Sequence, residues 1–209
     1  MLVDRQNFST HFDVSRETLE RLNEYERLLT KWNTKINLVS RNTLDEVWHR
    51  HFADSAQIYQ YIDRTATNWL DFGSGAGFPG LIAAVLAQEQ RPGMTFKLVE
   101  SDKRKAAFLM TVSNALGLSA EVVTDRIEAL PAQYSDVISA RAVAPLHQLL
   151  TWATPHAQKS SVLLFPKGNN YESELTNARK HWHIESETFP SITDSGSVIL
   201  RIRDIKRVD

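Results

Sequence analysis

Apolar residues recur every three or four positions near the start of the chain, and this spacing predicts an amphipathic helix. The apolar stripe consists of Leu19, Leu22, Tyr25, Leu29 and Trp32. Asp13 or Ser15 is placed to cap the start of this helix. A second helix is predicted to begin at Thr43, because Thr43 and Glu46 have the spacing of a capping box. Residues 1–64 are therefore predicted to form an N-terminal helical cap.

After residue 67 the pattern changes to short apolar runs that alternate with helical stretches. The predicted strands are Asn68–Phe72, Thr95–Glu100, Glu121–Thr124, Asp136–Ala140 and Val162–Phe165. The predicted helices span residues 79–90, 103–116, 145–158 and 171–182. This alternation is typical of a mostly parallel, doubly wound α/β sheet. Two last runs, Ile184–Phe189 and Val198–Asp204, are too close for a crossover helix and predict an antiparallel edge hairpin. We expect residues 65–209 to form one compact unit.

The amino-acid composition excludes several kinds of site and mechanism. The chain has 209 residues, a formal charge of −1 and no cysteine. The lack of cysteine excludes disulfides, thiolate metal sites, iron–sulfur clusters and a cysteine nucleophile. The start of the chain has no signal-peptide pattern, and the longest clean apolar run is Leu81–Ala87. That run is far shorter than the roughly 20 residues of a membrane span. We therefore expect a cytoplasmic protein without membrane contact.

The most informative segment is Asp71–Gly80, which follows the first predicted strand. Gly73, Gly75 and Gly77 let the backbone turn tightly and let a ligand approach it closely. A dinucleotide fingerprint, GxGxxG, needs a glycine where Phe78 stands, which disfavours a dehydrogenase. The spacing acidic-x-Gly-x-Gly-x-Gly is instead similar to motif I of the class I methyltransferases that use S-adenosyl-L-methionine (AdoMet).

Glu100 supports the same resemblance, because it ends the second predicted strand. The class I methyltransferases place a carboxylate there that accepts hydrogen bonds from the ribose hydroxyls of AdoMet, and a carboxylate is a good acceptor for a diol. The alternatives are a simple tight turn between strand and helix and a solvated acid. The conjunction of both features favours a cofactor site.

Five segments in order narrow the resemblance to one family. They are Lys31–Ser40 (KWNTKINLVS), Arg50–Ser55 (RHFADS), Asp71–Gly80 (DFGSGAGFPG), Glu100–Arg104 (ESDKR) with Phe108 and Leu109, and Ser139–Ala144 (SARAVA). Together they are similar to the bacterial ribosomal RNA small-subunit methyltransferase G family, also called glucose-inhibited division protein B. The resemblance covers nearly the whole chain. It implies a Rossmann-like class I methyltransferase fold, AdoMet as cofactor, and methylation of N7 of one guanine in the 530 loop of 16S rRNA.

The resemblance also carries cofactor contacts onto this sequence. They fall on Gly73, Gly75, Phe78, Glu100, Ile127, Glu128 and Arg141. Ile127 is expected against the adenine plane, Glu128 at the adenine edge, and Arg141 above the methyl position. Core packing is the alternative for Phe78 and Ile127, and a surface ion pair is the alternative for Arg141.

Methyl transfer from a sulfonium needs alignment more than acid–base chemistry, because the donor is already activated. Guanine N7 has a free lone pair, so we expect no general base and no metal. Arg141 and Lys167 are the predicted substrate-positioning residues, since either could hold guanine O6 or a phosphate. His51, Asp54 and Ser55 have the residue types of a hydrolase triad, but three residues on one helix do not easily form one. His51 and Asp54 are instead expected to join the helical cap to the rim of the cofactor loop.

The expected partner is 16S rRNA within the small ribosomal subunit, bound by a monomer. Basic residues that could contact RNA phosphates are Arg27, Lys31, Lys35, Arg41, Arg50, Lys103–Lys105, Arg201, Arg203, Lys206 and Arg207. Candidates for stacking on the target base are Phe78, Trp48 and Tyr171. Two alternatives stay open: a methyltransferase of the same fold that acts on another substrate, and a non-catalytic ribosome assembly factor.

Overall fold

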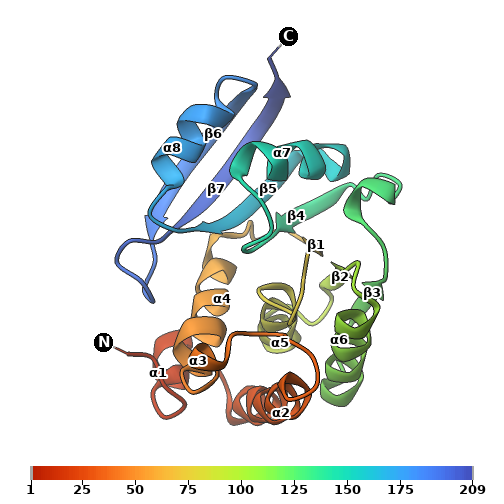
Figure 1. The fold of residues 1–209 in the computed structure, drawn as a ribbon, viewed down its shortest axis with the longest axis vertical. Helices are drawn as coiled ribbons and strands as arrows, with labels where there is room; N and C mark the ends of the chain where they lie inside the picture. Colours follow the sequence, from red (N-terminus) through yellow and green to blue (C-terminus); the bar gives the residue numbers. More distant parts are fainter. Residues whose placement is uncertain (1, 209) are drawn as a thin grey trace.

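A seven-stranded sheet lies at the centre of the computed structural model, which describes residues 2–208 (Figure 1). The strands are β1 (Asn68–Phe72), β2 (Thr95–Val99), β3 (Ala120–Val123), β4 (Ser135–Ser139), β5 (Ala157–Lys167), β6 (Trp182–Pro190) and β7 (Val198–Arg207). Their order is β3-β2-β1-β4-β5-β7-β6. Strands β1 to β5 pair in parallel, whereas β7 runs antiparallel to both β5 and β6. The doubly wound sheet with an antiparallel edge hairpin is thereby confirmed.

Helices cover both faces of this sheet. They are α1 (Phe8–Phe12), α2 (Arg16–Asn33), α3 (Arg41–Leu44), α4 (Asp54–Ala56), α5 (Gly80–Gln90), α6 (Lys103–Leu116), α7 (Leu146–Ala153) and α8 (Tyr171–Ala178). One buried cluster joins the N-terminal helices, α5 and α6 to one face, and a second joins α7 and α8 to the other. Trp69 points into the first cluster and Leu70 into the second, because successive side chains of a strand alternate between faces.

The N-terminal helices form an outer layer over α5 and α6 (Figure 1). Ser15 caps α2, and its hydroxyl accepts a hydrogen bond from the backbone N–H of Thr18 at 3.2 Å. The buried cluster runs without a break from this layer into the sheet. The division of the chain into residues 1–64 and 65–209 stays a prediction.

The second N-terminal helix differs from the expectation. Thr43 lies inside the short helix α3 and caps nothing; its hydroxyl donates to the Ser40 carbonyl and lies 2.9 Å from His51 Nε2. The chain then continues through a π-helical segment, Trp48–Ala53, and after α4 through a 3-10 segment, Gln57–Tyr61. The predicted capping box does not form, because Thr43 lies within α3 and its hydroxyl contacts Ser40 and His51.

Two predicted helices are shorter than expected. Helix α7 ends at Ala153, because Pro155 follows and a proline cannot continue a helix. Residues 157 and 158 then begin β5. Helix α8 ends at Ala178, and buried Trp182 begins β6 opposite Arg207. Within residues 2–208, no helix has the length and apolar character needed to cross a membrane.

Candidate functional site

The connection from β1 to α5 has a backbone that requires glycine. Gly73, Gly75 and Gly77 have φ angles of 64°, 55° and 91°, in the left-handed region that side chains disfavour. The N–H groups of Gly73 and Ser74 donate to the Val99 carbonyl at 2.8 and 3.2 Å, which ties this loop to the end of β2. The loop therefore lies at the carboxyl ends of neighbouring parallel strands, where ligands bind in such sheets.

Helix α2 holds the outer half of the glycine loop. The Tyr25 hydroxyl donates to the Ala76 carbonyl at 2.5 Å, and the Tyr25 ring stacks on Phe78 with centroids 5.7 Å apart. A Cβ atom at position 77 would overlap this hydroxyl and the Leu81 side chain. Complete burial raises the pKa of Tyr25 well above its usual value, so the hydroxyl stays a donor. The helical cap thus fixes the shape of the loop.

Glu100 clamps the loop from the opposite side. One carboxylate oxygen accepts from the N–H of Gly75 and the other from the N–H of Asp102, both at 2.8 Å. The residue is only 7% exposed. Each carboxylate oxygen retains a further lone pair, so the group can still accept from a ligand. The structure places Glu100 beside the glycine loop, and its contact with a ribose stays a prediction.

A cavity of about 90 Å³ opens next to this clamp. Its lining residues are Phe72, Gly73, Val99, Ser101, Asp125, Arg126, Ile127, Glu128, Val143 and Trp152. Ile127 supplies part of the apolar wall, and its carbonyl lies 3.2 Å from His156 Nε2, which fixes the segment. Glu128 belongs to the polar rim. Apolar walls with a polar rim suit a planar heterocycle such as adenine.

Phe78 does not line this cavity. Its ring is buried and lies under two groups: the His51 ring, 5.0 Å away and nearly parallel at 8°, and the Arg141 guanidinium, 5.0 Å from the ring centroid. The core-packing alternative describes this placement. The structure shows that Phe78 contacts Arg141. A direct contact between Phe78 and a cofactor stays a prediction.

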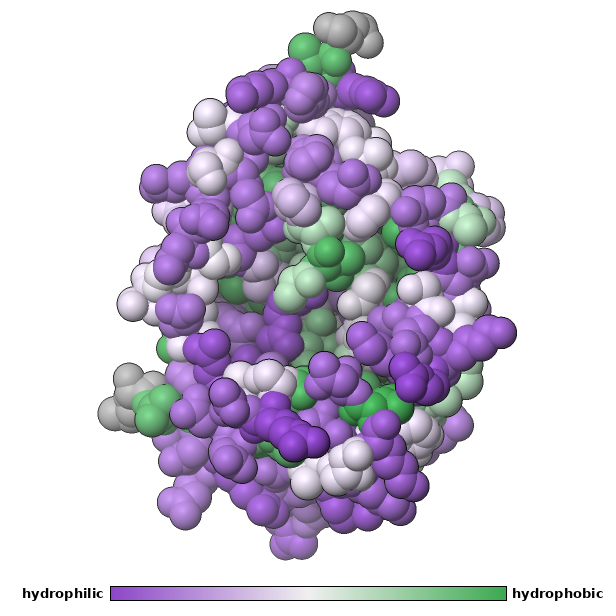
Figure 2. All heavy atoms as spheres, in the orientation of Figure 1, coloured by the Kyte–Doolittle hydropathy of each residue, from purple (hydrophilic) through white to green (hydrophobic). Residues whose placement is uncertain are grey.

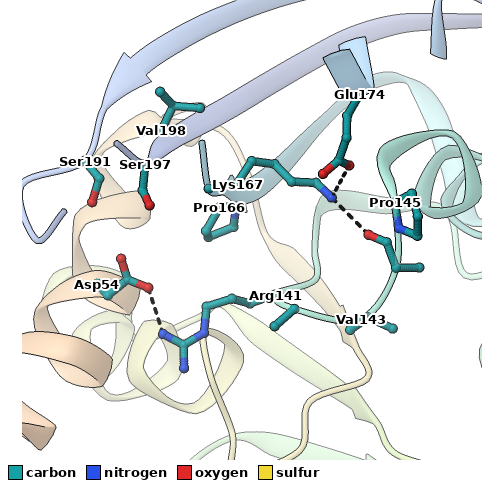
Figure 3. Close-up of a pocket in the computed structure, with 13 residues that line it drawn as sticks. Asp54, Arg141, Val143, Pro145, Pro166, Lys167, Glu174, Ser191, Ser197 and Val198 are labelled. Atoms are coloured by element: carbon teal, nitrogen blue, oxygen red, sulfur yellow. Dashed lines mark hydrogen bonds and ion pairs between the residues drawn. The ribbon is translucent and has the colours of Figure 1, made fainter. Parts of the chain in front are cut away.

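Arg141 joins the end of β4 to the helical cap. Its Nη1 donates to Asp54 Oδ2 at 2.7 Å, and its Nη2 donates to His51 Nδ1 at 3.1 Å (Figure 3 shows the ion pair). Burial, and then the positive charge of Arg141, lowers the pKa of His51 to about 4. The neutral ring can therefore accept from Arg141 while Nε2 bonds the Thr43 hydroxyl. Of the two residues expected to join the cap to the rim of the glycine loop, His51 reaches that loop by stacking on Phe78, whereas Asp54 reaches Arg141 instead.

A larger cleft of about 500 Å³ lies on the other side of Arg141 (Figure 3). Its lining residues are Asp54, Arg141–Pro145, Pro166, Lys167, Gly168, Glu174, Ser191, Ser197 and Val198. Two ion pairs stand apart in its wall, Asp54–Arg141 and Lys167–Glu174, each at 2.7 Å. Apolar side chains lie between them, and Figure 2 shows apolar residues gathered at the middle of a largely hydrophilic face.

Val143 forms a wall shared by the two cavities. It lines both of them, and a Cβ atom at position 73 would overlap its side chain. The neighbouring Ala142 has a φ angle of 56°, so the loop Arg141–Pro145 turns sharply there. The cofactor-side cavity and the cleft are therefore separated by one side chain.

Several predicted RNA contacts have other roles in the structure. Arg201 and Arg203 both donate to Asp63, at 3.1 and 2.5 Å, and so tie β7 to the end of the helical cap. Trp48 is buried in the first cluster, so it is not available for base stacking, and Tyr171 is only partly buried.

Sequence reasoning missed Val143 and Glu174. Val143 comes two residues after Arg141 and follows the same strand, which is a usable signal. Glu174 lies in the middle of an ordinary polar helix face, 33 residues after Arg141, and only the packing of α8 against the cleft brings it into the site. No pattern in the sequence distinguishes it from the neighbouring Glu172.

Comparison with known proteins identifies close relatives. A family model described as rRNA small subunit methyltransferase G matches residues 18–200. A ribosomal RNA small subunit methyltransferase G from Cereibacter sphaeroides is 46% identical over 204 residues, which cover 98% of this chain and 99% of that protein. A protein of the same name from a Ruegeria species is 47% identical over 196 residues, covering 94% of this chain and 95% of that protein.

Solved structures agree on the fold. A TehB-like SAM-dependent methyltransferase from Corynebacterium glutamicum matches with a TM-score of 0.57 and 14% identity, over 88% of this chain and 99% of that chain. A SAM-dependent methyltransferase from Aquifex aeolicus also matches with a TM-score of 0.57 and 14% identity, over 86% of this chain and 98% of that chain. The predicted class I methyltransferase fold is confirmed.

Proposed function

The chain belongs to the rRNA small subunit methyltransferase G family, and on that premise we propose the details of its reaction. It is an AdoMet-dependent methyltransferase of 16S rRNA. The methyl group goes to N7 of a guanine in the 530 loop. The enzyme acts as a monomer in the cytoplasm, on rRNA within the small ribosomal subunit.

The observation that carries the proposal is the single wall between two cavities. On one side of Val143 lie the glycine loop and the Ile127 cavity, and on the other side lies the cleft with Arg141. A donor on the first side and an acceptor base on the second would meet at this wall. Direct transfer requires donor and acceptor to be held close together, and two cavities that share one lining residue would bring them close.

The residues on the first side fit AdoMet. The left-handed glycines leave the backbone bare, Glu100 offers free lone pairs, and Ile127 forms an apolar wall beside the polar Glu128. We propose that these residues, with Gly73 and Gly75, hold the cofactor. AdoMet supplies a methyl group on a positively charged sulfur, which needs no further activation.

The remaining chemistry is positioning. Guanine N7 carries a lone pair at neutral pH, so the enzyme needs no base to remove a proton. Arg141 is held by Asp54 and by neutral His51, its guanidinium lies over the Phe78 ring, and the residue lines the cleft. We propose that Arg141 and Lys167 orient the target nucleotide. Rigid positioning of this kind can lower the barrier by roughly 7–11 kcal/mol.

The proposal is tested with methyl-labelled AdoMet and small subunits from cells that lack this enzyme. After digestion of the RNA, the label is expected in 7-methylguanosine from the 530 loop. Small subunits that already carry the modification are the control and should take up no label. Label in another nucleoside would contradict the N7 assignment. AdoMet binding without any transfer would favour the assembly-factor alternative.

A further inference from the structure

The ion pair between Lys167 and Glu174 is held in a fixed place in the cleft. Lys167 Nζ donates to Glu174 Oε2 at 2.7 Å and to the Ala144 carbonyl at 2.9 Å. The same Oε2 accepts from the backbone N–H of Leu146 at 2.7 Å. The Lys167 side chain is only 9% exposed. Three elements, β5, α7 and α8, thus fix the two charged groups relative to each other.

In this pair, one N–H donor of Lys167 and one acceptor oxygen of Glu174 have no hydrogen-bond partner among the described residues. An ammonium has three N–H bonds, and Lys167 uses two of them. Within residues 2–208, every hydrogen bond to the Glu174 carboxylate goes to Oε2, which leaves Oε1 with its lone pairs. Both residues line the cleft, and Figure 3 shows them together in its wall. A ligand in the cleft would meet a donor directly beside an acceptor.

Guanine has the complementary pattern on one edge. Its O6 accepts hydrogen bonds, the adjacent N1–H donates, and the N2 amine donates next to it. Adenine has the reverse order, a donating amine at C6 and an accepting N1. A neighbouring lysine and carboxylate therefore match guanine and oppose adenine.

We propose that Lys167 and Glu174 form the edge of the cleft that selects guanine. Lys167 donates to O6, and Glu174 Oε1 accepts from N1–H and the N2 amine. N7 lies on the other side of O6, which leaves it free to face Arg141 and Val143, the wall shared with the cofactor cavity. Pro145 and Pro166 supply apolar surface for the faces of the base. This assignment rests on the proposed function.

The competing explanation is a purely structural ion pair between β5 and α8. It predicts that Glu174 affects folding and leaves the choice of base unchanged. The Glu174→Gln variant separates the two. The oxygen of the new side-chain amide must stay at the Oε2 position to accept from Leu146 and Lys167, so the amide NH2 takes the place of Oε1. The variant therefore presents a donor where guanine also presents donors.

The test compares guanosine with inosine as the target nucleotide of reconstituted small subunits. Inosine keeps O6, N1–H and N7 and lacks only the N2 amine. The wild-type enzyme is expected to favour guanine at least tenfold in kcat/KM, because inosine leaves part of the carboxylate unpaired. Glu174→Gln is expected to bring the guanine-to-inosine ratio below threefold and to lower the rate on guanine at least thirtyfold. Glu172→Gln, on the exposed side of the same helix, is the matched control and should keep the wild-type ratio.

The outcomes separate this inference from the proposed function. If the wild-type enzyme does not form 7-methylguanosine, the proposed function is wrong. If it does, and wild type and Glu174→Gln discriminate guanine from inosine equally, the guanine-selecting edge is wrong. The thermal midpoint and the AdoMet dissociation constant of the variant check its folding. Should the variant fail to fold, equal wild-type rates on guanine and inosine would by themselves overturn the assignment to the N2 amine.

Discussion

At the scale of single residues, three side chains from separate segments meet at Arg141. Asp54 and His51 reach it from the helical cap, and Phe78 supports it from the glycine loop. Arginine can only donate hydrogen bonds, so His51 Nδ1 must accept, and the low pKa of His51 keeps the ring in that state. His51 therefore holds the Arg141 guanidinium in place, and we propose that it acts as a positioning residue for Arg141.

We expect the effect of replacing His51 on kcat to depend on whether the new side chain keeps a hydrogen-bond acceptor for Arg141. His51→Asn places an amide oxygen near the position of Nδ1, so kcat should stay within about fivefold of wild type. His51→Leu removes the acceptor and should lower kcat by about one to two orders of magnitude, because a misplaced positioning group costs that much. The KM for AdoMet should change less than kcat in both variants. Steady-state kinetics on unmethylated small subunits provides the measurement. Equal kcat values for the two variants would refute the positioning role.

At the scale of elements, the sequence predicts the regular parts of the fold well. Strand β1 has the predicted bounds, because a run of buried residues between turn signals leaves few alternatives. The π-helical segment Trp48–Ala53 does not follow the 3.6-residue period, so periodicity places its residues without predicting its geometry. The contacts of His51 with Arg141 depend on that geometry. The glycine loop was predictable from local backbone rules, whereas Glu174 enters the site only through tertiary packing.

The loop Arg141–Pro145 should respond to the cofactor. Val143 is 37% exposed and occupies the space directly over Gly73. A ligand that lies along the glycine loop must displace or cover this side chain. We expect AdoMet to slow the exchange of the Val143 and Ala144 amide hydrogens at least fivefold, as followed by hydrogen exchange with mass spectrometry. Amides in the paired stretch of β6 and β7 should not change. Unchanged exchange in the loop at saturating AdoMet would count against a cofactor site at Gly73.

At the scale of the whole molecule, buried Asp71 and partly buried His51 act on stability in opposite directions. Burial raises the pKa of Asp71 to about 6, although Ser139 donates to it at 2.6 Å. Asp71 in the folded protein thus keeps its proton up to a higher pH than Asp71 in the unfolded chain does. This tighter proton binding stabilises the fold in acid, and the stabilisation is lost as the pH rises through 6. His51 acts the other way, because its folded pKa lies near 4, below the ordinary 6.5. Its contribution is present above pH 6.5 and is lost as the pH falls towards 4.

Because Asp71 and His51 have opposite effects on stability as the pH changes, the Asp71→Asn variant should depend on pH differently from the wild type. Between pH 4.5 and 7 the two groups partly cancel in the wild type, so their joint effect on the free energy of unfolding is small. Asp71→Asn removes the acid-stabilising member of the pair. Relative to wild type, the variant should therefore lose on the order of 2 kcal/mol as the pH falls from 7 to 4.5. Urea denaturation at the two pH values measures the difference, and other titrating groups cancel in the comparison. An equal change in the free energy of unfolding between the two pH values in both proteins would contradict the raised pKa of Asp71.

The whole molecule is organised so that the helical cap and the sheet meet at the site. Tyr25 supports the glycine loop, while Asp54 and His51 support Arg141. A second contact, from Arg201 to Asp63, ties the cap to β7 away from the cleft. Arg141 and Arg201 are thus two arginines of similar burial, each paired with an aspartate of the cap, and only one of them lines the cleft.

This pair allows the most direct test of the site. The rate of a single turnover of methyl transfer to unmethylated small subunits is measured for wild type, Arg141→Ala and Arg201→Ala. Both variants lose one ion pair between cap and core, so a general loss of rigidity would slow them alike. We predict that Arg141→Ala lowers the rate at least a hundredfold, while Arg201→Ala stays within threefold of wild type once the folded fraction is taken into account. Full turnover by Arg141→Ala, or an equal loss in the two variants, would contradict the placement of the reaction at Arg141.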